Sequence, residues 1–361
     1  MYDVVVVGGG IGGLTVAALL SARGMNVCLL ERQSQVGGCI ARVEFSGHDF
    51  EPGMGLYTSF GPGGVYEKLF ARLPVDPPAT SLLASPYIMR STDGRDVTID
   101  QEDLFSISGG PASLAERLAE SIKRSGGNVR LNSPVLRLSY DEAGRASGVD
   151  LLTGERVFAR KAIISNLTVW DTYGKLVGLN RTPPEIKKHL NTLRGAGIYV
   201  VYASMEEAAV SRLPAERMLV RDGEGKFTMA ISSSQTAPPG KRPVTFTSRT
   251  EVDSWFAYQS SEEDYEEWDQ QALEQFWNRL HAALPELGSD IEIIETANPR
   301  TYYDQTRRKL GMVLGVEGAS PASSSTFLPN LFIIGDTVSS VPKLNSVVET
   351  AIFLTTKALS H

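Results

Sequence analysis

Asp3–Gly13 reads Asp-Val-Val-Val-Val-Gly-Gly-Gly-Ile-Gly-Gly, and this stretch decides the fold. An unbroken apolar run such as Val4–Val7 is typical of a parallel strand that is buried on both faces. The run leads directly into Gly8-x-Gly10-x-x-Gly13. Such a glycine fingerprint presents backbone N–H groups and a helix N-terminus to the pyrophosphate of a dinucleotide. The stretch therefore predicts the first half of a βαβ nucleotide-binding unit.

The next segment supplies the acidic residue that such a unit needs. A helical stretch, Leu14–Arg23, is closed by Gly24 and followed by a second apolar strand, Val27–Leu30. That strand ends at Glu31, where a carboxylate accepts hydrogen bonds from a ribose hydroxyl. The same negative charge would repel a 2′-phosphate, so NADP is disfavoured as the bound dinucleotide.

Later motifs distinguish flavin from nicotinamide binding. They are Val36–Arg42, Phe50–Gly55, Ile107–Pro111, Asn132–Val135 and Asn330–Asp336. Together with the fingerprint they resemble the FAD-dependent phytoene desaturase, carotenoid isomerase and retinol saturase group, within the wider amine-oxidase-like flavoproteins. The resemblance covers most of the chain and is strongest at its two ends. Cys39, after the Gly-Gly pair, resembles the saturase and isomerase branch, because amine oxidases more often have arginine there.

The resemblance implies FAD as the cofactor and also implies which residues hold it. The segment at Val135 would meet the adenine with its backbone, and the Asp336 carboxylate would hold the ribityl chain. The implied FAD-binding residues are Gly8, Gly10, Ile11, Gly12, Gly13, Glu31, Arg32, Gly37, Gly38, Cys39, Gly53, Met54, Val135, Asn166, Gly335, Asp336, Ser346 and Val347.

Two features depart from the family pattern. The loop 342–348 follows the late Gly-Asp pair but lacks the glycines that the family usually has there. The chain is also shorter than most members, and the missing length falls where relatives build the substrate domain and its membrane-docking helices. We therefore expect a substrate cavity smaller than a full-length carotenoid requires.

Composition indicates a globular enzyme with a large core. The 361 residues are 42% hydrophobic, and the formal net charge of −7 argues against a nucleic-acid partner. No apolar run approaches the roughly 20 residues of a membrane-spanning helix, so a cytoplasmic protein is expected. Peripheral membrane contact and the oligomeric state stay open. Scattered histidines predict no metal site, and a disulfide between Cys28 and Cys39 is not expected.

The pattern predicts an α/β fold of glutathione-reductase-like architecture with two domains. A discontinuous FAD-binding Rossmann domain would comprise 1–75, 102–165 and 296–361. Within it, residues 155–159 and 162–165 are predicted to form two separate strands. An α+β substrate domain, 76–101 and 166–295, would be built on an antiparallel sheet. A long helix at 262–284 would pack its aromatic side chains against that sheet as core, in preference to forming a substrate box.

The resemblance implies hydride transfer between a C–C bond of an apolar or partly conjugated metabolite and the flavin. Desaturation and redox-neutral isomerisation both fit. Glu51 and Tyr57 are candidates for proton handling, whereas Tyr57, Tyr302, Tyr303 and Arg308 are candidates for substrate contact. Two alternatives stay open: amine oxidation at a C–N bond, and a non-catalytic prenyl- or lipid-binding protein of the same fold.

Overall fold

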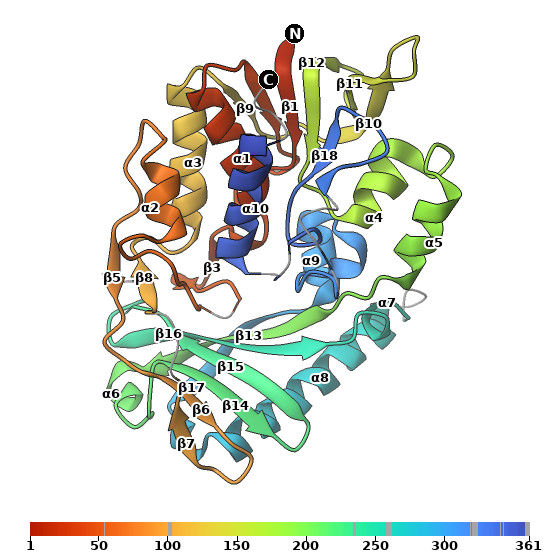
Figure 1. Cartoon of the computed structure of the whole chain (residues 1–361). Coiled ribbons are helices and arrows are strands. Elements are labelled where there is room, and N and C mark those ends of the chain that lie inside the picture. Colours follow the sequence, from red (N-terminus) through yellow and green to blue (C-terminus); the bar gives the residue numbers. More distant parts are fainter. Residues whose placement is uncertain are drawn as a thin grey trace.

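The computed structural model describes residues 1–53, 55–99, 103–233, 236–257, 262–317, 319, 324–339, 341 and 343–357. Figure 1 shows two sheets, one beside the N-terminus with helices packed against it and one at the opposite end of the molecule. The architecture is mixed α/β, as the sequence predicts.

The first sheet is the Rossmann-like one. Its strand order is β10-β11-β12-β1-β2-β9, and β18 also pairs with β12. The parallel strands are β1 (Tyr2–Val7), β2 (Val27–Leu30), β9 (Asn128–Arg130), β12 (Arg156–Ser165) and β18 (Leu331–Ile333). The antiparallel meander is β10 (Val135–Tyr140), β11 (Ala146–Leu151) and the first half of β12. The sequence pattern predicted two strands at 155–159 and 162–165, but the structure joins them into one.

Helices cover both faces of this sheet, as the apolar run in β1 requires. Val4 and Val6 face a core shared with α1, α2, α3 and α10, whereas Val5 and Val7 face Trp170 on the opposite side. The helices of the first face are α1 (Ile11–Ala22), α2 (Val65–Phe70), α3 (Ala112–Arg124) and α10 (Leu344–Lys357). Those of the second are α4 (Val169–Asp171), the π-helical η2 (Thr172–Gly178) and α5 (Pro184–Thr192).

The second sheet has the order β17-β13-β16-β15-β14-β6-β7 and is antiparallel except for the β14–β6 pair. Its strands are β17 (Ile291–Ala297), β13 (Gly197–Glu206), β16 (Lys241–Thr250), β15 (Gly225–Ile231), β14 (Arg217–Asp222), β6 (Tyr87–Arg90) and β7 (Asp96–Thr98). Helix α8 (Glu262–Ala283) packs Phe276 and Leu280 into one core with Val201 and Phe246 of the sheet. This confirms the prediction that the aromatic side chains of the helix at 262–284 pack against the sheet as part of the core.

The remaining elements are short. They are β3 (Val43–Phe45), β4 (His48–Phe50), β5 (Thr80–Leu82), β8 (Phe105–Ile107), α6 (Glu207–Val210), α7 (Ser254–Ala257), α9 (Pro299–Thr306) and the single turns η1 (Gly38–Ile40), η4 (Pro285–Leu287) and η5 (Lys309–Gly311). The helices at 169–192 pack on the first sheet although the sequence placed 166–295 in the substrate domain. The domain limits remain a prediction.

In the described part of the chain, no helix is long and apolar enough to cross a membrane.

Candidate flavin site

The glycine loop between β1 and α1 is packed so closely that its glycines are sterically required. Gly8 has a φ of +100°, which side-chain-bearing residues rarely adopt. A Cβ atom on Gly13 would lie 2.3 Å from the carbonyl oxygen of Gly8. Helix α1 begins at Ile11, and no side chain caps its N-terminus. The loop is thus a backbone cradle of the kind that binds a pyrophosphate.

Asn166 supports this loop from the end of β12. Cβ atoms on Gly10 and Gly12 would lie 2.7 and 2.8 Å from the Asn166 amide. In the amide orientation that satisfies both of its atoms, the nitrogen donates to the carbonyl of Ile334 and the oxygen accepts from the Gly10 N–H, each at 3.2 Å. The structure therefore places Asn166, a predicted FAD-binding residue, against the glycine loop itself.

Glu31 is fixed at the end of β2 by backbone hydrogen bonds. The N–H of Gly9 donates to Glu31 Oε2 at 2.6 Å, and the N–H of Gln33 donates to Oε1 at 2.8 Å. The N–H of Ser133 donates to the Glu31 carbonyl at 2.8 Å, which brings the segment that leads to Val135 alongside. The residues assigned to ribose and adenine are therefore neighbours.

The Gly37-Gly38 turn forms a second wall of the cradle. The N–H of Gly37 donates to the Gly9 carbonyl at 2.8 Å, and Gly37 has a φ of +117°. Cys39 follows in η1, where burial raises the pKa of its thiol. Both cysteines of the chain are free.

The C-terminal motif closes the cradle from the other side. Gly335 has a φ of +129° after β18. Helix α10 carries Ser346 and Val347, and Val347 Cγ1 would lie 3.1 Å from a Cβ atom on Gly12. Val347 therefore packs against the fingerprint.

Arg308 forms an ion pair with Asp336. Arg308 Nη2 donates to Asp336 Oδ2 at 2.6 Å, and Arg308 Nε donates to the carbonyl of Met312 at 2.6 Å. Both side chains are largely buried. Arg308, predicted as a substrate anchor, thus lies beside the carboxylate assigned to the ribityl chain.

Three further residues were predicted to bind FAD: Arg32, Gly53 and Met54. The Arg32 guanidinium donates to the carbonyl of Gln305. Thr247 Oγ1 donates to the Gly53 carbonyl at 3.2 Å, which ties that loop to the second sheet. Met54 lies outside the described residues.

Tyr302 and Tyr303 point in different directions, because consecutive residues of a helix are about 100° apart. Tyr302 is buried in one cluster with Phe50 and Tyr202. Tyr303 instead meets the ring of Phe256 edge-on, with 5.6 Å between the ring centroids. Burial and the neighbouring Tyr202 hold the pKa of Tyr302 well above its usual value. The two tyrosines therefore have different neighbours and do not share one packing environment.

Glu51 and Tyr57 are neighbours, and a third residue joins them. The Tyr57 hydroxyl donates to Glu51 Oε2 at 2.7 Å, and Arg217 Nη2 lies 3.6 Å from Glu51 Oε1. Burial and the Glu51 charge hold the pKa of Tyr57 well above its usual value, so the phenol stays protonated. Arg217 is almost fully buried and also donates to the carbonyls of Gly55 and Ile231. Sequence reasoning missed Arg217, because an arginine at a strand end is ordinarily exposed.

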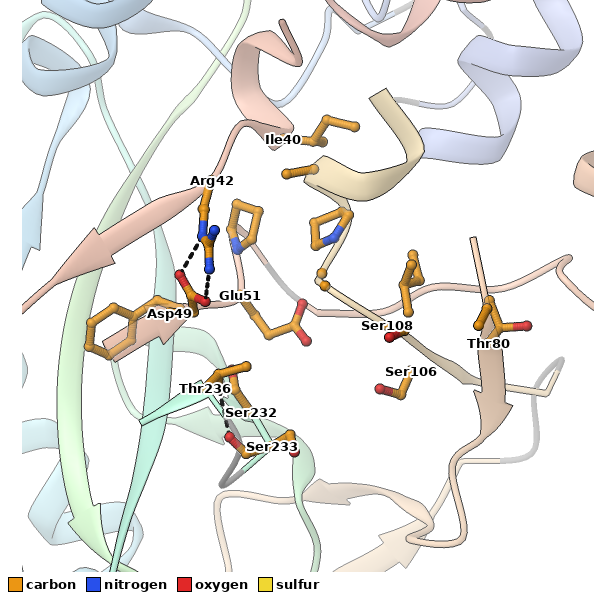
Figure 2. Close-up of a pocket in the computed structure, with 18 of the residues that line it drawn as sticks. Ile40, Arg42, Asp49, Glu51, Thr80, Ser106, Ser108, Ser232, Ser233 and Thr236 are labelled. Atoms are coloured by element: carbon orange, nitrogen blue, oxygen red, sulfur yellow. Dashed lines mark hydrogen bonds and ion pairs between the residues drawn. The ribbon is translucent and has the colours of Figure 1, made fainter. Parts of the chain in front are cut away.

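A cavity of about 370 Å³ opens beside Glu51, as Figure 2 shows. Among the described residues it is lined by η1, β4 and the loop after it, β5, β8, the start of α3 and the loop after β15. None of the residues expected to contact substrate, Tyr57, Tyr302, Tyr303 and Arg308, is among the described residues that line it. The substrate-contact residues remain a prediction.

Comparisons with known proteins define the class. The model of the NAD(P)-binding Rossmann-like domain matches residues 6–73, and that of the flavin containing amine oxidoreductases matches residues 89–340. The chain belongs to the family of flavin-containing amine oxidoreductases. This confirms the expected oxidoreductase family, the fold class and a flavin cofactor.

Two of the curated relatives are, by name, a prolycopene isomerase and a carotenoid desaturase. Prolycopene isomerase from Daucus carota is 24% identical over 251 residues, which is 63% of this chain and 40% of the relative. A carotenoid 3,4-desaturase from Haloarcula japonica is 43% identical over 75 residues, 21% of this chain and 14% of the relative. The chain thus spans less than half the length of these relatives.

Solved structures support the fold. An oxidoreductase from Methanosarcina mazei superposes with a TM-score of 0.74 at 15% identity and covers 98% of this chain and 100% of its own. Putrescine oxidase bound to putrescine gives 0.68 at 14% identity, with 100% and 99% coverage. At these identities the likeness shows the fold alone.

Proposed function

We propose that this chain binds FAD in the glycine cradle and acts on a C–C bond of an apolar or partly conjugated metabolite, as a desaturase or a redox-neutral isomerase. The observation that carries the proposal is the intact cradle: Gly8 and Gly13 form a turn too closely packed for side chains, and Glu31 is held at its edge by the Gly9 N–H. A non-catalytic prenyl-binding protein would not need that cradle. The relatives' names support a polyene-like substrate over an amine.

Named residues would hold each part of the cofactor. Gly10–Gly13 would present backbone N–H groups to the pyrophosphate, Glu31 would accept from the adenosine ribose, and the segment at Val135 would contact the adenine. Asp336 would accept from the ribityl chain, and Val347 would pack beside Gly12. When bound, FAD supplies a reversible hydride acceptor.

The chain's own contribution to the chemistry is to position groups and to hold a proton. The Tyr57 phenol stays protonated, and its O–H group donates a hydrogen bond to Glu51. Arg217 holds Glu51 in place through an ion pair. The Arg217 guanidinium is itself positioned by hydrogen bonds to the carbonyls of Gly55 and Ile231. Glu51 is therefore our candidate to accept or return a proton at the substrate.

Asp336→Ala should weaken FAD binding by about 10- to 100-fold. A hydrogen bond to a charged acceptor contributes about 1.5–3 kcal/mol, and each 1.4 kcal/mol is about tenfold in affinity. Titration of the apoprotein with FAD measures the change. Asp93→Ala, in the exposed β6–β7 turn, is the matched control. Unchanged affinity in Asp336→Ala would remove Asp336 from the site.

NADH and NADPH should reduce the bound flavin only slowly. The sequence holds one strand–Gly-x-Gly-x-x-Gly unit, which FAD would fill, and Glu31 would repel the 2′-phosphate of NADPH. Stopped-flow mixing under anaerobic conditions measures the rate. Fast reduction that saturates with nucleotide concentration would show a second dinucleotide site and contradict the assignment.

The reaction itself is tested by anaerobic mixing with a panel of unsaturated apolar compounds and of amines. With members of the first group we expect loss of the oxidised-flavin absorbance if the protein is a desaturase, or an isomerised product formed on the chemically reduced protein without net flavin oxidation if it is an isomerase. Reduction by primary or secondary amines alone would favour amine oxidation instead. A protein that takes up no FAD at all would favour the binding-protein alternative.

A further inference from the structure

Several hydroxyl groups line the cavity beside Glu51, together with apolar side chains. Thr80, Ser106, Ser108 and Ser232 all contribute to its wall. Figure 2 shows the Glu51 side chain extending into the space, with Ser106 and Ser108 on one side and Ser232 on the other. This lining differs from the all-apolar wall that a pure hydrocarbon would favour.

The charged groups of the lining are neutralised within the described protein. Arg42 donates from Nε to Asp49 Oδ1 at 2.7 Å. Glu51 is balanced by Arg217 at 3.6 Å and accepts from Tyr57. An ammonium ligand would need an uncompensated carboxylate, and an anionic ligand would need a free cation. The described cavity wall offers neither, so it suits an uncharged ligand.

The hydroxyl group of Ser232 is buried and lacks a hydrogen-bond partner among the described residues. Its side chain is 4% exposed, and among the described residues its hydroxyl oxygen has no partner. The backbone around it is fixed, because the Ser232 N–H donates to the carbonyl of Pro243 at 2.9 Å and the Ser232 carbonyl accepts from Arg242 Nε at 2.6 Å. A buried hydroxyl without a partner costs free energy unless a ligand or a water molecule satisfies it.

We propose that this cavity binds an uncharged, hydroxyl- or carbonyl-bearing end of the substrate. A ligand oxygen accepts from Ser232 or Ser106, and a ligand hydroxyl donates to Glu51. Ile40 and Ile107, which also line the cavity, pack against the carbon chain next to that oxygen. The inference rests on the proposed function in taking the ligand as the substrate, and it narrows the substrate to oxygenated apolar metabolites.

The test uses four probes that share one branched, unsaturated carbon skeleton: geraniol, geranylamine, geranic acid and the corresponding hydrocarbon. Binding to the FAD-loaded protein is measured by equilibrium dialysis. We expect geraniol to bind at least about tenfold more tightly than the other three, since one hydrogen bond from a serine and one to a carboxylate together contribute at least about that factor. Ser232→Ala and Ser106→Ala should each lower geraniol affinity about 3- to 10-fold without changing hydrocarbon binding. Ser211→Ala, an exposed hydroxyl outside the cavity, is the control.

Three outcomes overturn the inference. Tightest binding by geranylamine would make the cavity an ammonium site, and equal binding of alcohol and hydrocarbon would show that it does not recognise oxygen. Binding of none of the probes would exclude it as a site for this chemistry. Dialysis measures bound ligand independently of turnover. If geraniol binds but unsaturated compounds neither reduce the flavin nor are isomerised by the reduced protein, the proposed reaction fails while the inference on ligand binding stands.

Discussion

Protein carrying Gly13→Ala should purify without FAD and unfold at a lower temperature than the wild type. The new methyl group would lie 2.3 Å from the Gly8 carbonyl oxygen, which is backbone and cannot rotate away. Forcing an extra carbon into a packed site typically costs about 1–3 kcal/mol. The same displacement would move the N–H groups of the cradle, so FAD affinity should fall by about 100-fold or more.

The measurements are the ratio of flavin to protein absorbance after purification and the melting temperature. Gly223→Ala is the matched control, because a Cβ atom there would meet no atom within 4 Å. Gly13→Ala protein that saturates with FAD at wild-type concentrations would show that the loop rearranges freely, and the steric account of the fingerprint would fail.

The nucleotide-binding half of the fold follows from local sequence. The strand, the glycine turn and the helix of 3–22 are consecutive, so a short pattern predicts them and their contacts together. The sequence pattern wrongly divided β12 into two strands, because the exposed Arg160 and Lys161 interrupt its apolar run. The backbone continues through them, since the strand passes there from the antiparallel meander into the parallel sheet.

Features that depend on distant pairing could not be read from the sequence. Strand β17 alternates only weakly, and its pairing with β13 joins segments almost a hundred residues apart. The motifs placed Asn166 and Arg308 near the flavin. They did not show that Asn166 supports the glycine loop or that Arg308 pairs with Asp336. Those roles depend on side chains that meet only after both sheets have formed.

Arg217 is the clearest residue of this kind, and its replacement gives the second large expected effect. Arg217→Met should lower the melting temperature by about 5 °C. Removing one partner of a buried ion pair costs about 3–5 kcal/mol, and in a chain of 361 residues each kcal/mol shifts the transition by about 1.3 °C. The variant would leave Glu51 without its cation and the carbonyls of Gly55 and Ile231 without a donor.

A double variant separates charge from packing. In Arg217→Met/Glu51→Gln the unpaired buried charge is gone, so we expect at least half of the lost melting temperature to return. Arg221→Met, an exposed arginine on the same strand, should change stability by no more than about 0.5 kcal/mol. If Arg217→Met melts like the wild type, or if the double variant is no better than the single one, Arg217 does not hold Glu51. The carboxylate beside the cavity would then need another explanation for its position.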